Sequence, residues 1–96
     1  MARVYVGIGS NIERETNIRG AVQALRERYG PLILSCVYES QPIGFEGANF
    51  YNLVAGFETS QPVEQLMREL RYIELNHERK RTGKRFESRT LDLDLL

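Results

Sequence analysis

Two aspartates separated by one residue stand near the end of the sequence and could hold a divalent cation. Three leucines alternate with Asp92 and Asp94, and this period of two predicts a half-buried strand. Residues two apart on a strand project from the same face, with Cα atoms roughly 6.6 Å apart. Both carboxylates are therefore expected on the wet face of the strand, where they could bind Mg²⁺, a cation that prefers oxygen ligands.

A cationic stretch comes directly before the two aspartates. Residues 79–89 contain six of the thirteen Lys and Arg residues and a single acid, Glu87. A guanidinium can bind phosphate oxygens through two parallel hydrogen bonds. A basic run alone is typical of a solvated loop, and acids on the wet face of a strand are ordinary. Side by side, however, they indicate a site for a magnesium–polyphosphate substrate.

Length and composition predict one globular domain over residues 1–96. Of the 96 residues, 42% are hydrophobic and 27% are charged, and the net charge is zero. A neutral chain argues against a general nucleic-acid or membrane-surface binder, and no apolar run approaches the roughly 20 residues of a membrane span. Cys36 is the single cysteine, so no internal disulfide can form, and the start of the chain resembles no signal peptide. We expect a cytoplasmic location.

The elements that must position these residues follow from the apolar pattern. Alternation predicts strands over residues 4–8, 32–40, 50–59 and 90–96. Helical spacing predicts one helix from an N-cap at Thr16 or Asn17 to residue 29, and a second, capped by Ser60, that ends near His77. The order βαββαβ predicts an α+β, ferredoxin-like fold, with two helices on one face of an antiparallel four-stranded sheet. The open face should then collect Asp92 and Asp94 together with side chains of the third strand.

Other sites are excluded or left open by the sequence. Gly7-x-Gly9 lacks the third glycine of a dinucleotide fingerprint, and no P-loop is present. We interpret His77, the single histidine, as a helix-end residue and not as a metal ligand. Glu74 falls inside the apolar stripe of its helix, which is unexpected unless something satisfies the carboxylate. It could reach water or an arginine, or it could bind a ligand.

The sequence resembles the 6-hydroxymethyl-7,8-dihydropterin pyrophosphokinases of the folate pathway over essentially its whole length. The block Arg89-Thr-Leu-Asp92-Leu-Asp94 is the most specific part of the resemblance. The other matching segments, in chain order, are Gly9-Ser10-Asn11 with Asn17, Tyr38-Glu-Ser40-Gln-Pro42-Ile-Gly44, Phe50-Tyr-Asn52 followed by Glu58-Thr59, Glu74, and Arg79-x-Arg81.

The resemblance implies transfer of diphosphate from ATP to the 6-hydroxymethyl group of the dihydropterin, which leaves AMP. It implies no covalent protein nucleophile, two Mg²⁺ ions held by Asp92 and Asp94, and a monomer with small-molecule partners only. Its implied catalytic residues are Arg79, Arg81, Arg89, Asp92 and Asp94. Its implied ATP-binding residues are Glu74, Arg79, Arg81, Phe86, Arg89 and Leu95. Its implied pterin-binding residues are Ser40, Gln41, Pro42, Ile43, Phe50 and Asn52.

The sequence also departs from the family pattern. Gln41 and Phe86 stand where the family usually has proline and tryptophan, and Phe50 stands where a tyrosine is common. Glu87-Ser88 replaces Gly-Pro, and an acid near phosphates is unfavourable. Relatives continue with a C-terminal segment that helps to enclose the substrates. We therefore expect these 96 residues to fold, to bind Mg-ATP weakly, to turn over slowly, and to expose Phe50 in a patch that favours self-association.

Two other functions are compatible with such a fold. Ferredoxin-like domains also bind RNA, but the RNP pattern of aromatic residues on the central strands is absent here. A non-catalytic relative that binds pterin or nucleotide without turnover would keep most of the same residues. Titration with ATP and a pterin analogue, followed by an assay of AMP release, separates this alternative from the enzyme.

Overall fold

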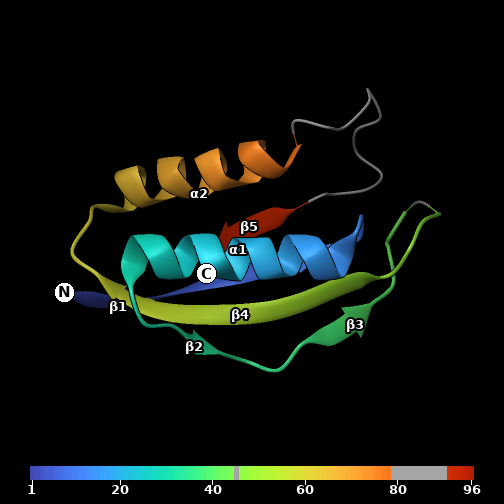
Figure 1. Ribbon diagram of the computed structural model, residues 1–96, viewed down its shortest axis with the longest axis horizontal. Coiled ribbons are helices and arrows are strands. Elements are labelled where there is room, and N and C mark those ends of the chain that lie inside the picture. The colour runs from blue at the N-terminus through green and yellow to red at the C-terminus, as the bar shows by residue number, and fades with distance from the viewer. Residues whose placement is uncertain (45, 79–90) are drawn as a thin grey trace.

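The computed structural model describes residues 1–44, 46–78 and 91–96. The predicted α+β class and the order of helices and strands are confirmed (Figure 1). The elements are β1 (Ala2–Ser10), α1 (Arg14–Tyr29), β2 (Ile33–Leu34), β3 (Tyr38–Ser40), β4 (Phe50–Thr59), α2 (Val63–Glu78) and β5 (Asp92–Leu95).

The strands form one antiparallel sheet in the order β2-β4-β1-β5, and β3 also pairs with β4. The central pair β1–β4 is in register from Ala2 opposite Thr59 to Ser10 opposite Tyr51. The second half of β1 pairs on its other side with β5. This half of β1 therefore lies between the two strands that carry the predicted pterin and metal residues.

The predicted second strand over residues 32–40 is wrong as a single element, because it is divided into β2 and β3. Ser35 lies between the two pieces and bonds to Val54 of β4 through both its backbone and its side chain. Its N–H donates to the Val54 carbonyl (2.9 Å), and its hydroxyl accepts from the Val54 N–H (2.8 Å). A side-chain oxygen here takes the place of a backbone acceptor, which is how serine competes with a regular ladder.

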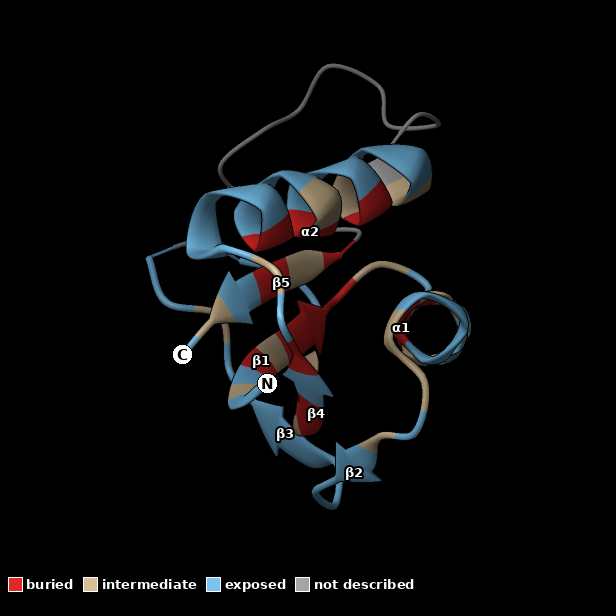
Figure 2. Cartoon of the chain, turned by 90° about the vertical axis from the view of Figure 1, so that its left-hand side faces the viewer, coloured by how far each residue is buried: buried red, intermediate tan, exposed pale blue. Residues whose placement is uncertain are grey.

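Both helices pack on one side of the sheet, as expected. Helix α1 contacts β1 and β4, and α2 contacts β5; Figure 2 shows the buried residues of α2 on its side toward β5. The apolar side chains on the inner face of the strands and on the buried stripes of the helices form one hydrophobic cluster. Its members are Val6, Ile8, Ile18, Ala21, Leu25, Leu53, Ala55, Phe57, Leu66, Leu70, Ile73, Leu91 and Leu93. None of the helices in the described ranges is long and apolar enough to cross a membrane.

The predicted helix caps are wrong. Helix α1 begins at Arg14, after Glu13 in a left-handed conformation (φ 42°) that makes no side-chain cap. Asn17 is already inside the helix, and its amide donates backward to the Ile12 carbonyl (2.6 Å).

Helix α2, in contrast, begins later than a cap at Ser60 would allow. The Leu66 N–H donates to the Pro62 carbonyl (3.0 Å), which places Pro62 at the N-cap position. Proline is tolerated there because the first N–H groups of a helix have no intrahelical partner.

Candidate active site

A hollow of about 400 Å³ lies on the open face of the sheet, away from the helices. Side chains and backbone of β1, β3, β4 and β5, together with the segment that follows β3, form its lining. Most of the predicted site residues in the described part of the chain meet there. These are Ser40, Gln41, Ile43, Phe50, Asn52, Asp92 and Asp94.

The two aspartates are placed by their register against β1. Asp92 pairs with Gly9, and Asp94 pairs with Gly7. Asp94 is exposed and Asp92 is half-buried. Because glycines stand opposite them, no side chain from β1 covers the carboxylates. Asp92 and Asp94 are the only charged side chains among the described lining residues.

The carboxylate pair fits magnesium better than a metal held wholly by protein. Among the described residues, no group of three His, Cys, Asp or Glu side chains could enclose an ion. Mg²⁺ commonly takes one or two carboxylates and completes its octahedron with water and substrate phosphates. Asp92 and Asp94 are the residues that would hold it.

Asn52 and Phe50 of β4 form the other side of the hollow. The Asn52 amide donates from Nδ2 to the Ser40 hydroxyl (2.8 Å), which fixes the direction of the amide plane. Its Oδ1 lies 3.2 Å from the point where a Cβ on Gly9 would stand, and a ring carbon of Phe50 lies 3.9 Å from the same point. The space above Gly9 thus has an acceptor oxygen and an aromatic edge beside it, which suits a flat ring that carries N–H groups.

Gly9→Ala should weaken binding of 6-hydroxymethylpterin about tenfold, because crowding a packed site typically costs about 1–3 kcal/mol and tenfold is roughly 1.4 kcal/mol. The new methyl would press against Asn52 Oδ1. Gly7→Ala is the matched control, since its nearest neighbour would be Leu96 Cδ2 at an ordinary 3.6 Å. Calorimetric titration of both variants measures the difference. Equal pterin affinities would show that the ring does not lie above Gly9.

Glu74 has a structural partner that the sequence did not reveal. Its Oε2 accepts a hydrogen bond from the backbone N–H of Leu93 (2.7 Å), and the residue is half-buried. Leu93 lies between Asp92 and Asp94 on β5, at the end of the sheet order. The carboxylate of α2 therefore holds the strand that carries the acidic pair, and this explains an acid within an apolar stripe. Glu74 does not line the hollow.

The remaining predicted residues are not brought to the hollow or cannot be placed. Leu95 packs against the hydrophobic core on the face covered by the helices, and half-buried Pro42 is not among the lining residues. Phe50 is half-buried, so the expectation that it would be exposed is wrong. The exposed apolar side chains of the hollow are Tyr38, Ile43 and Leu96. Arg79, Arg81, Phe86 and Arg89 lie outside the described residues.

His77 connects the end of α2 to the start of α1. Its Nδ1 lies 2.9 Å from Asn17 Oδ1. Because the Asn17 amide nitrogen donates to the Ile12 carbonyl, its oxygen must accept, and His77 donates from Nδ1. This contact agrees with the interpretation of His77 as a helix-end residue. Burial lowers the pKa of His77 below its usual value.

The stability of the fold should therefore fall as the pH drops below about 6.5, the ordinary histidine pKa. The unfolded chain binds a proton there more readily than the folded one, so the contribution of His77 is complete above that pH. It is lost as the pH falls toward the lower folded pKa. Thermal melts at about pH 7.5 and about pH 5.5 should show a larger drop for the wild type than for His77→Gln. The same drop in both would contradict the assignment.

The structure also shows site residues that the sequence reading missed. Tyr38, Gly7 and Gly9 line the hollow. Tyr38 and Gly9 belong to segments that match the family pattern, and Gly7-x-Gly9 is an incomplete dinucleotide fingerprint, but none of the three was assigned to a ligand. The spacing of Gly7 and Gly9 was a usable signal for this site. Residues two apart on a strand share one face, and a face without side chains lets a ligand approach the backbone closely. The role of Glu74 offered no such signal, because its partner is a backbone group.

The comparison with protein families identifies the chain. The pattern described as 7,8-dihydro-6-hydroxymethylpterin-pyrophosphokinase (HPPK) matches residues 5–96. The chain belongs to this family. A family member of Aquifex aeolicus (strain VF5), a 2-amino-4-hydroxy-6-hydroxymethyldihydropteridine pyrophosphokinase, is 37% identical over 98 residues, which cover 100% of this chain and 61% of the relative.

Two further relatives agree with the family assignment. The pyrophosphokinase of the same name from Campylobacter jejuni subsp. jejuni serotype O:2 (strain ATCC 700819 / NCTC 11168) is 37% identical over 95 residues, covering 95% of this chain and 60% of the relative. A folate synthesis bifunctional protein of Arabidopsis thaliana is 31% identical over 97 residues, which cover 97% of this chain but only 20% of that protein. The chain thus spans about 60% of the length of the two bacterial family members.

Proposed function

We propose that this chain carries the pterin and magnesium–ATP sites of a diphosphokinase that transfers diphosphate from ATP to 6-hydroxymethyl-7,8-dihydropterin. One observation carries the proposal. A single row across the sheet places Asn52, Gly9 and Asp92 side by side, since Gly9 pairs with both of the others. Adjacent strands are about 4.8 Å apart, so the backbones of Asn52 and Asp92 stand roughly 10 Å apart on either side of Gly9.

That separation suits a bicyclic ring with a substituent at its far end. The pterin lies above Gly9, with N–H groups toward Asn52 Oδ1 and its ring against Phe50. The hydroxymethyl group then points toward Asp92 and Asp94. Membership of the HPPK family supports the choice of ligand, and the hollow supports its placement.

The reaction needs positioning and charge neutralisation more than a protein nucleophile. The hydroxymethyl oxygen attacks the β-phosphorus of ATP, the new O–P bond forms as the hydroxyl proton is lost to water, and the bond from the β-phosphorus to the bridging oxygen of the α-phosphate breaks to release AMP. Magnesium, when bound, supplies positive charge to the triphosphate. Asp92 and Asp94 would hold the metal, and Asn52 would orient the ring. Arg79, Arg81 and Arg89, by their place in the family pattern, bind the phosphates.

An assay of AMP release tests the proposal. AMP should form only when ATP, magnesium and 6-hydroxymethyl-7,8-dihydropterin are all present, and EDTA should stop it. Calorimetry with 6-hydroxymethylpterin and a non-hydrolysable ATP analogue provides the binding control. Pterin binding without AMP would favour the non-catalytic alternative. No pterin binding at all would contradict both.

A further inference from the structure

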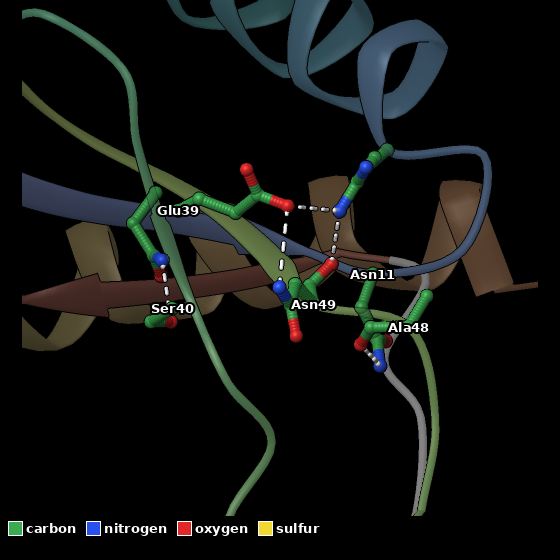
Figure 3. A network of polar contacts seen from close by, with 7 residues as sticks. Asn11, Glu39, Ser40, Ala48 and Asn49 are labelled. Atoms are coloured by element: carbon green, nitrogen blue, oxygen red, sulfur yellow. Dashed lines mark hydrogen bonds and ion pairs between the residues drawn. The ribbon is translucent and has the colours of Figure 1, made fainter.

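Arg14, the first residue of α1, contacts both ends of the segment that connects β3 to β4. Its Nη1 donates to the Asn49 carbonyl (2.7 Å), at the residue just before β4. The same nitrogen forms an ion pair with Glu39 Oε2 (3.3 Å), on the strand that leads into the segment. Figure 3 shows Glu39 and Asn49 facing one another at this point, and the Asn49 amide also donates to Glu39 Oε2 (3.3 Å).

The guanidinium is held in place by an aromatic ring. Its Cζ lies 3.9 Å from the ring centroid of Tyr51 on β4, and Tyr51 pairs with Glu39 across the strands. A planar guanidinium can stack on a ring and donate hydrogen bonds at its edge at the same time, whereas an ammonium cannot. The Arg14 side chain is 30% exposed and that of Glu39 is 49% exposed, so the ion pair alone is a surface contact of modest strength, and the stack on Tyr51 adds to it.

The segment between these ends forms one wall of the hollow. Gln41 and Ile43 line it, yet Ile43 is 91% exposed. Among the described residues, little packs against Ile43 in this wall, and we infer that the position of the wall depends on how its two ends are fixed. Asn11 adds a second attachment near the far end by donating from Nδ2 to the Ala48 carbonyl (3.0 Å) (Figure 3). Arg14 is not among the described residues that line the hollow, so any effect that it has on a ligand is indirect.

We propose that Arg14 is a positioning residue for pterin binding, because it clamps the two ends of the segment that forms the wall beside the ring. The identity of the ligand rests on the proposed function, whereas the clamp itself does not. Apparent affinity falls in proportion to the fraction of molecules whose binding site is in place. If removal of the clamp leaves about one molecule in ten with the wall in position, the pterin Kd rises about tenfold.

Arg14→Gln tests this inference, with Arg19→Gln as the matched control. Arg19 lies on the same helix, and within the described ranges its ion pair is with Glu15, one turn earlier (3.2 Å). Hydrogen–deuterium exchange of the ligand-free chain should accelerate over residues 38–44 and 46–52 in Arg14→Gln and stay unchanged in Arg19→Gln. The pterin Kd should rise about tenfold, while the Kd of a magnesium-bound ATP analogue should change less than about twofold. If Arg14→Gln fails to fold, Glu39→Gln serves as the second variant. It removes the other charge of the ion pair and should show the same changes at a smaller size.

The outcomes separate the clamp from the proposed function. Unchanged exchange in Arg14→Gln would overturn the clamp. Faster exchange with an unchanged pterin Kd would overturn its role in positioning. Equal losses of pterin and ATP affinity would also overturn it, because they would indicate general damage to the fold. If the wild-type chain binds no pterin while Arg14→Gln still accelerates exchange, the proposed function fails and the clamp stands.

Discussion

Replacing Asp94 by asparagine is expected to reduce magnesium-dependent AMP release by at least about 100-fold, the scale seen when a charge-stabilising group is removed from an active site. The amide keeps the size of the side chain but loses the negative charge that attracts a hard cation. Asp94 is exposed on β5 and is not part of the hydrophobic core. Folding stability should therefore change by less than about 0.5 kcal/mol.

Steady-state assays over a range of magnesium concentrations, together with thermal melts, measure the two effects separately. Glu64→Gln is the control, because Glu64 is an exposed acid in the first turn of α2 and does not line the hollow. It should leave both turnover and stability unchanged. Normal turnover by Asp94→Asn would show that the metal is not bound where the strand register places it.

Glu74→Ala is expected to reduce both stability and turnover. The Leu93 N–H loses its acceptor at 2.7 Å in a half-buried position, and an unsatisfied buried group costs about 1–3 kcal/mol. For a domain of this size, each kcal/mol lowers the Tm by roughly 4–8 °C. Turnover should fall as well, because the residue that loses its anchor stands between Asp92 and Asp94.

Glu74→Gln separates the hydrogen bond from the charge. The amide oxygen can still accept from Leu93, but a neutral acceptor makes a weaker bond than a carboxylate does. We therefore expect its Tm to lie between those of the wild type and Glu74→Ala. If Glu74→Ala has the same Tm as the wild type, the contact with Leu93 contributes nothing to the stability of the fold, and its role in holding the acidic pair is refuted.

Much of the site could be predicted because alternation along a strand assigns each side chain to a face. The placement of Asp92 and Asp94 opposite the buried leucines follows from a period of two. The same rule put Asn52 and Phe50 on the open side, and the hollow brings these four residues together. Their common position is thus a consequence of pattern and pairing order.

The contacts that hold the site could not be predicted in the same way. Arg14 meets Glu39 and Asn49, which lie 25 and 35 residues further along the chain, and no local pattern marks such a partner. The break between β2 and β3 likewise depends on one hydroxyl, that of Ser35, which replaces a backbone acceptor. These features depend on tertiary geometry, which helical and strand periodicity do not contain.

Paramagnetic relaxation in a ternary complex tests the central claim that pterin and metal share one hollow. Mn²⁺ prefers the same oxygen ligands as magnesium and would replace it, with a non-hydrolysable ATP analogue and 6-hydroxymethylpterin bound to the wild-type chain. The account predicts strong broadening of the hydroxymethyl protons of the pterin, and loss of that broadening in Asp94→Asn. Sharp hydroxymethyl signals in a wild-type complex shown by calorimetry to be fully occupied would contradict it.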